Sequence, residues 1–201
     1  MQLQTQTCEK LAEFFALLIL RIWNPEMKYE NLIVEDPEMK NLFVTLATAL
    51  QRVFRLSKVP ISCVITALIY LKRLQNHLAG VQINAIYRAF TVSLVIAQKY
   101  NEDSHFANVL WARVTGIPLA ELTEMERDFL RLTCYGVSIQ PAEFNRWKKV
   151  VQTEFKGFLV FKERLTFVNS IARAPDASPD LLPKEQHCLM QAVQNNVICN
   201  F

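Results

Sequence analysis

The sequence predicts an all-α protein. Apolar residues recur with the period of a helix, and not with the alternation of a strand, along nearly the whole chain of 201 residues. Hydrophobic residues make up 51% of the composition, which supplies a core and excludes a disordered chain. Glycine is rare, and its four positions coincide with breaks in the apolar pattern. We interpret these glycines as boundaries between helices: Gly80, Gly116, Gly136 and Gly157.

Two amphipathic helices are predicted first, over about residues 5–23 and 37–57. The first ends before Pro25, and its apolar stripe is more typical of packing on its own domain than of binding a partner. The segments 61–71 and 85–97 differ, because each is apolar almost all the way round. A helix of that kind must be buried on all sides. We therefore expect the domain to be built around these two segments.

Shorter helices are expected to cover the two buried ones. One spans about 105–115 and is closed by Gly116, and Pro118 then opens another that Gly136 ends. Pro141 starts a further helix that continues to about residue 155. The stretch 173–183 is predicted to be a linker because it holds three prolines, and 184–199 is compatible with a last helix.

The predicted organisation has three parts. Residues 1–36 form an N-terminal helix and linker, 37–140 a compact bundle of five helices, and 141–201 a C-terminal helical extension that contains the proline-rich linker. No internal repeat is visible, and the residues outside the bundle are too few for a second copy of it.

The composition excludes several classes of function. Walker-type loops and dinucleotide-binding turns need clustered glycines, which the chain lacks. The 22 Lys and Arg against 19 Asp and Glu give a net charge of +3, with no basic concentration typical of nucleic-acid binding. Paired carboxylates, or a nucleophile beside a base, are not found at any recognisable spacing. We expect no enzymatic activity, no cofactor, no nucleic acid and no small-molecule substrate.

The five cysteines are odd in number and widely spaced, which favours a reducing compartment and an intracellular location, cytoplasmic or nuclear or both. His187 and Cys188 are adjacent and Cys199 follows, but this spacing matches no zinc pattern, so we expect no metal site. The apolar run at 11–23 is interrupted by charges, is too short to span a bilayer and lacks the features of a signal peptide. We expect no membrane partner.

Four fragments resemble a cyclin box in their order and spacing: IYLKRLQ at 69–75, IAQKYNED at 96–103, ANVLWARVTGIPLAEL at 107–122 and MERDFLRLTCYGV at 125–137. The resemblance is to the Pho-type (P/U-type) cyclins, which carry a single box. In that branch a short acidic loop precedes an aromatic residue followed by Ala-Lys/Arg-Val-x-Gly-Ile, as in 111–117 here. The resemblance covers about residues 37–155. It implies five helices around a buried central helix.

The resemblance also implies a function. Cyclins are regulatory subunits that bind a cyclin-dependent protein kinase and hold the regulatory helix of its N-lobe in the active position, so that the kinase can form its own Lys–Glu ion pair. An alternative of another class is a cyclin-fold transcription adaptor, which binds protein or DNA and does not activate a kinase. That alternative would need a basic face and usually two repeats.

Five kinase-binding residues follow from the resemblance. Lys99 matches the Lys near the end of the third box helix and Glu126 the Glu of the fifth, which bond main-chain groups of the kinase and pair with each other. The apolar contacts correspond to Leu130, Tyr135 and Val137. Without the resemblance, Lys99 is simply favourable near a helix C-terminus, Glu126 is typical of a solvated carboxylate, and the three apolar residues are typical of core.

The sequence departs from the family's pattern at two places. NLFVTL at 41–46 stands where cyclins of the A and B type carry a substrate-recruiting Met-Arg-x-x-Leu motif, so we expect no groove of that kind. Gln98 stands where small residues are usual. Ser178-Pro179 in the predicted linker is a minimal proline-directed phosphorylation site.

Overall fold

The computed structural model describes residues 2–25, 37–77 and 83–172. All regular structure in these ranges is helical, which confirms the predicted fold class. The chain forms two compact units, Met1–Trp147 and Lys148–Phe201. The predicted linker 173–183, the last helix, Ser178-Pro179 and the residues His187, Cys188 and Cys199 lie outside the described ranges, as does Gly80.

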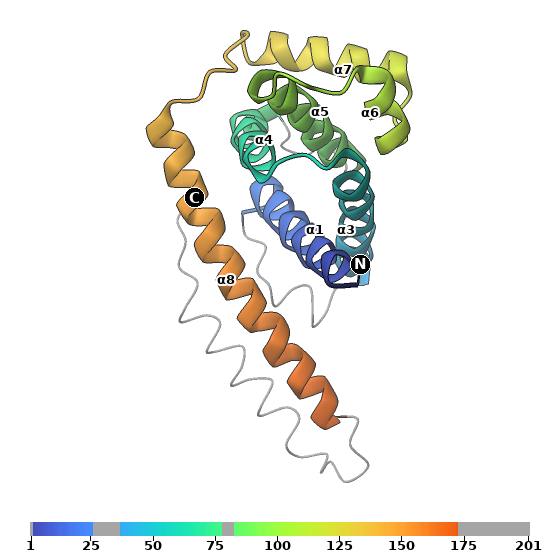
Figure 1. Cartoon of the computed structure of the whole chain (residues 1–201), viewed down its shortest axis with the longest axis vertical. Helices are drawn as coiled ribbons and strands as arrows, with labels where there is room; N and C mark the ends of the chain where they lie inside the picture. Colours follow the sequence, from blue (N-terminus) through green and yellow to red (C-terminus); the bar gives the residue numbers. More distant parts are fainter. Residues whose placement is uncertain (1, 26–36, 78–82, 173–201) are drawn as a thin grey trace. The chain divides into compact units, whose positions relative to one another are not determined.

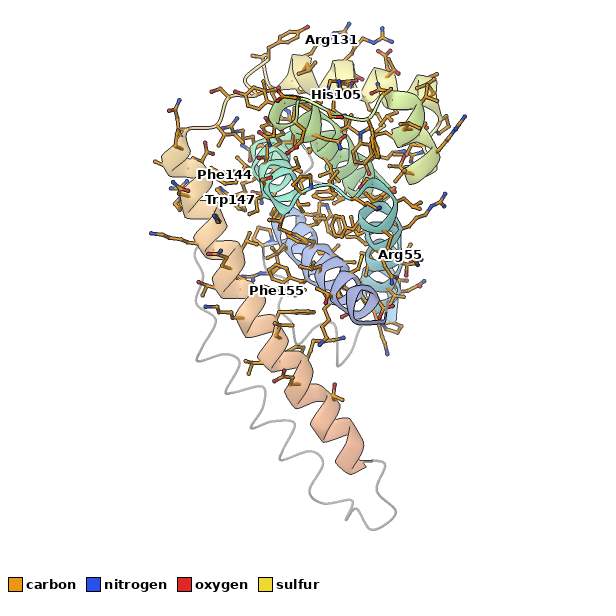
Figure 2. All side chains as sticks on the ribbon, viewed as in Figure 1. Arg55, His105, Arg131, Phe144, Trp147 and Phe155 are labelled. Atoms are coloured by element: carbon orange, nitrogen blue, oxygen red, sulfur yellow. The ribbon has the colours of Figure 1, made fainter. Side chains whose placement is uncertain are left out.

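Six α-helices and one short 3-10 turn make up the described part of the first unit (Figure 1). They are α1 (Gln2–Trp23), α3 (Pro37–Ser57), α4 (Ile61–Leu74), η1 (Gln75–His77), α5 (Ile83–Asn101), α6 (Asn108–Thr115) and α7 (Leu119–Leu132). The helix α8 (Pro141–Ala172) begins in this unit and continues into the second.

The centre of the first unit is formed by α4 and α5, as predicted. Every residue from Cys63 to Leu71 in α4 is buried, and so is every residue from Phe90 to Gln98 in α5. The two helices pack directly on each other. Buried hydroxyls bond within the core, since Ser93 Oγ donates to the carbonyl of Ala89 at 2.7 Å.

A third buried helix is α1, which the pattern had indicated as amphipathic. Its residues from Phe14 to Leu20 are all buried, and α1 packs on α3, α4 and α5. The ring of Phe15 lies edge-on to Phe14 at 5.2 Å and to Phe54 of α3 at 5.8 Å. The amphipathic interpretation of this half of α1 is therefore wrong, because residues on every side of the helix are buried.

The covering helices α6 and α7 contact each other and α5, and α6 also contacts α3 (Figure 1). Gly116 closes α6 as predicted, in the left-handed conformation at φ 78°. Pro118 directly precedes α7.

The end of α7 differs from the prediction that Gly136 stops it. The helix ends at Leu132, and the left-handed residues that follow are Cys134 at φ 48° and Tyr135 at φ 59°. Gly136 is needed for close approach, because a Cβ there would lie 2.9 Å from the carbonyl oxygen of Thr133.

The helix α8 starts at Pro141 as predicted but runs to Ala172, far beyond the predicted end near 155. The expected boundary at Gly157 is wrong, since this glycine lies inside the helix with no atom within 4 Å of an added Cβ. A glycine in a helix interior costs only about 1 kcal/mol relative to alanine, which does not stop a helix. Within the second unit, the rings of Phe155 and Phe158 stack at 6.5 Å.

Within the ranges that the structure covers, we find no helix with the length and apolar character needed to cross a membrane. The same ranges contain no group of three or more His, Cys, Asp or Glu side chains arranged to hold a metal ion.

The burial of α1 predicts a large loss of stability when its core face is truncated. Phe14 is 0% exposed, so Phe14→Ala should lower the free energy of unfolding by about 3–5 kcal/mol. Val44 of α3 is 51% exposed, so Val44→Ala should change it by no more than about 0.5 kcal/mol. Urea unfolding followed by circular dichroism measures both. Equal effects of the two substitutions would show that α1 is not part of the core.

A buried thiol and a buried phenol on α4 predict that the free energy of unfolding falls at alkaline pH. Burial raises the pKa of the Cys63 thiol to about 11 and that of the Tyr70 phenol to about 12. The unfolded chain releases these two protons at lower pH than the folded protein does. The free energy of unfolding therefore keeps its full value below about pH 9 and falls as the pH rises through 11 and 12. Urea unfolding between pH 8 and 12 should show this fall, and Cys63→Ala with Tyr70→Phe should flatten it. If the double variant loses stability with pH as steeply as the wild type, these two groups do not cause the fall.

Candidate functional site

A polar cluster forms where the end of α5 meets α6 and α7. Lys99 Nζ donates hydrogen bonds to both carboxylate oxygens of Glu126, at 2.6 Å to Oε1 and 2.8 Å to Oε2. Asn108, the first residue of α6, donates from Nδ2 to Oε2 at 2.8 Å. We call Lys99, Glu126 and Asn108 the polar cluster. Three helices are thus joined at one carboxylate.

The polar cluster is partly buried and keeps bonding capacity. The side chains of Lys99 and Glu126 are 28% and 17% exposed. An ammonium group has three protons, and the bonds to Glu126 use two of them, so one proton bonds no side chain in the described ranges. Oδ1 of Asn108 is buried and accepts no hydrogen bond from the described residues. The cluster therefore offers a cationic donor and an unused acceptor beside each other.

Glu126 is more constrained than the solvated carboxylate that its acidic neighbours indicated. It accepts three hydrogen bonds from two side chains, and in two of them both donor and acceptor are charged. Its bonds therefore link the middle of α7 to the end of α5 and the start of α6.

Gln98 explains how the loop after α5 is held. It is 4% exposed, and its Oε1 accepts hydrogen bonds from Trp111 Nε1 and from the backbone N–H of Phe106, each at 3.1 Å. Trp111 is fully buried, so its indole N–H needs an acceptor inside the protein. The departure from small residues at position 98 thus supplies that acceptor and positions the start of α6.

The last turn of α5 is also tied to α4. Asn101 Nδ2 donates to Thr66 Oγ1 at 3.0 Å, and the Cys63 thiol donates to Glu102 Oε1 at 3.7 Å. Lys99 therefore stands on a helix end that is fixed from two sides.

The three apolar site residues lie on the segment that follows Glu126. Leu130, one helical turn later, and Val137 are partly buried, whereas Tyr135 is 69% exposed. Tyr135 is therefore not a core residue, so the alternative that all three apolar residues belong to the core is wrong for it. The structure joins Lys99 and Glu126 directly and carries the apolar residues on one continuous stretch beside them.

Asn108 was missed in the sequence. It lies within the fragment 107–122, but an asparagine at the start of a helix is typical of a cap, and nothing in the sequence pattern links it to Glu126. The bonds of Gln98 were missed for the same reason, since its partners are recognisable only in three dimensions.

The family model described as Cyclin matches residues 22–137, more than half of the chain, and this match includes the whole polar cluster. The chain belongs to the cyclin family.

Relatives among curated proteins agree with this assignment. The chain is 28% identical to Cyclin-U4-1 of Arabidopsis thaliana over 55% of its length and 56% of that protein. It is 30% identical to Cyclin-P4-1 of Oryza sativa subsp. japonica over 55% of its length and 53% of that protein. A third relative, PHO85 cyclin CLG1 of Saccharomyces cerevisiae, is 24% identical over 80% of the chain and 37% of that protein.

These relatives confirm the predicted resemblance to Pho-type cyclins. The chain spans about half the length of the first two relatives. No solved structure gives a significant match.

The bonds of Gln98 predict that a side chain of similar size without an acceptor destabilises the protein. Gln98→Met leaves the buried Trp111 N–H unpaired and should lower the free energy of unfolding by about 1–3 kcal/mol. Gln51→Met is the matched control, because the side-chain amide of Gln51 donates to Glu9 in an exposed hydrogen bond. Urea unfolding compares the two. A Gln98→Met protein as stable as the control would contradict the role of this amide.

Proposed function

We propose that this chain is a regulatory cyclin subunit, which binds a cyclin-dependent protein kinase, holds the regulatory helix of its N-lobe in the active position and does no chemistry itself. The observation that carries the proposal is the partly buried ion pair of Lys99 and Glu126, at 2.6 Å, on residues that match the polar kinase contacts of cyclins. The family match over 22–137 supports it.

The polar cluster suits a partner's main chain. The remaining Nζ proton of Lys99 is available to a backbone carbonyl of the kinase, and a charge-assisted bond of this kind is strong. Such a bond depends little on the partner's side chains. Leu130, Tyr135 and Val137 then pack on the kinase helix and exclude water from the polar contact. With its helix held inward, the kinase forms the ion pair that orients ATP phosphates.

The identity of the partner is approached through the yeast relative, which is named as a cyclin of PHO85. This name supports a cyclin-dependent kinase as partner and makes PHO85 the first kinase to be tried, within a panel of purified cyclin-dependent kinases.

The main prediction concerns the ion pair. Lys99→Glu together with Glu126→Ala should abolish co-purification with the kinase, because it removes the cationic donor and places a like charge against the partner's carbonyls. The pair is partly exposed, so helicity and the melting temperature should change little. Pull-down and titration against the kinase panel measure the binding, and circular dichroism measures the fold.

The matched control is another ion pair between the same two helices. Arg88 Nε lies 2.7 Å from Glu121 Oε1, nearer the start of α5 and of α7. Arg88→Ala with Glu121→Ala should keep full binding. If the variant of Lys99 and Glu126 binds as well as this control, the interface assignment is wrong.

A kinase assay separates activation from mere binding. The wild-type chain should raise the phosphotransfer rate of the kinase and show no phosphotransfer alone. A complex that forms without any rise in rate would contradict the activating role. Salt-dependent binding to duplex DNA would favour the adaptor alternative instead.

A further inference from the structure

The turn between α7 and α8 has an unusual backbone. Cys134 and Tyr135 are both left-handed, at φ 48° and 59°, although neither is glycine. L-residues with side chains adopt this conformation at a cost in free energy, so such turns persist only where the surroundings hold them. Tyr135 is 69% exposed and gains little from burial in its own unit. Backbone bonds hold its start, because the N–H of Tyr135 donates to the carbonyl of Leu130 at 2.7 Å and the N–H of Gly136 donates to that of Thr133 at 2.8 Å. Side chains hold the residues that follow.

Two side chains of α4 bond three successive carbonyls of the turn. Arg73 donates from Nη1 to the carbonyl of Gly136 at 2.9 Å and from Nη2 to that of Ser138 at 3.1 Å. Tyr70 donates its hydroxyl to the carbonyl of Val137 at 2.6 Å. Arg73 Nη2 also bonds Glu143 Oε2 at 2.9 Å, at the start of α8. We call Arg73 and Tyr70 the carbonyl clamp.

The clamp projects from a helix whose middle is fully buried. Tyr70 is 0% exposed within the buried stretch of α4, and burial raises the pKa of its phenol to about 12, so the hydroxyl stays a donor even in mild alkali. Arg73 lies one turn later, with its guanidinium carbon 5.9 Å from the centre of the Tyr70 ring. A planar guanidinium can bond several acceptors at fixed angles, which a lysine cannot do.

We propose that Arg73, supported by Tyr70, is a positioning residue for partner binding: it holds the turn at 134–138 so that Tyr135 and Val137 are set in place before the kinase arrives. This inference rests on the proposed function, because the kinase is the partner that the turn would meet. The clamp itself does not touch the kinase. Its effect is to raise the population of the binding-competent turn, which raises the apparent affinity in proportion.

A double-mutant cycle tests the proposal. The four proteins are the wild type, Arg73→Met, Tyr135→Ala and the double variant, each titrated against the cyclin-dependent kinase that the wild-type chain binds in the panel. Arg73→Met should weaken binding about tenfold in the wild type, because the competent turn becomes a minor conformation. In the Tyr135→Ala background the same change should weaken binding by less than about threefold, since Arg73 acts largely through Tyr135.

Two controls separate positioning from a general structural role. Glu143→Gln leaves the bonds to the three carbonyls in place and should keep wild-type affinity. Tyr70→Phe removes only the hydroxyl at Val137 and should weaken binding in the same direction as Arg73→Met, which keeps the test usable if Arg73→Met folds poorly. Amide hydrogen exchange without kinase should speed up at Tyr135, Gly136 and Val137 in Arg73→Met, while α5 exchanges as before.

The outcomes are distinct. The positioning role would be overturned if Arg73→Met weakened kinase binding equally in the wild-type and Tyr135→Ala backgrounds. It would also be overturned if Arg73→Met and Tyr70→Phe both bound the kinase with wild-type affinity. Either result would leave the proposed function standing if the variant of Lys99 and Glu126 still fails to bind. Absence of binding by the wild-type chain to every kinase of the panel would overturn the proposed function and the positioning role together.

Discussion

The complete burial of the middle of α4 is the constraint on which the rest of the first unit depends. Nine successive residues from Cys63 to Leu71 are inside the core, so this helix can neither rotate nor shift without exposing apolar surface to water. The polar groups of α4 therefore keep fixed positions, and other segments are held by bonding to them. Thr66 accepts a bond from the end of α5, and Tyr70 bonds the turn after α7. A few polar atoms in the buried part of α4 thus hold the two segments that carry the candidate site, the end of α5 and the turn after α7.

The core and the polar cluster contribute differently to stability. Apolar contacts of α1, α3, α4 and α5 supply the core, whereas the polar cluster of Lys99, Glu126 and Asn108 is only partly buried. A partly exposed ion pair contributes little to folding, typically about 0–1 kcal/mol. It gains strength when a partner excludes water from it. Under the proposed function these charges are kept for the interface with the kinase, with Gln98 and the carbonyl clamp fixing the surrounding backbone.

Much of the fold was predictable because its signal is local. Continuous apolar runs identified α4 and α5, and proline and glycine marked several helix ends, as at Pro141 and Gly116. The pairing of Lys99 with Glu126 came from the resemblance of four fragments, not from the chemistry of either residue. The burial of α1 was not predictable from its own pattern, because it depends on how many helices surround it. The bonds of Gln98, Asn108 and Arg73 join residues far apart in sequence, and no periodicity encodes them.

The position of α1 has a practical consequence for how the folding unit is delimited. The family match begins at residue 22, but α1 begins at Gln2 and fills the space against α3, α4 and α5. A fragment trimmed to the matched residues would leave those helices with a large bare apolar face, and such faces make proteins associate and precipitate. The smallest fragment that keeps this core covered is therefore longer than the segment that sequence similarity outlines. The family match leaves out most of α1, although the middle of this helix is as deeply buried as the middles of α4 and α5.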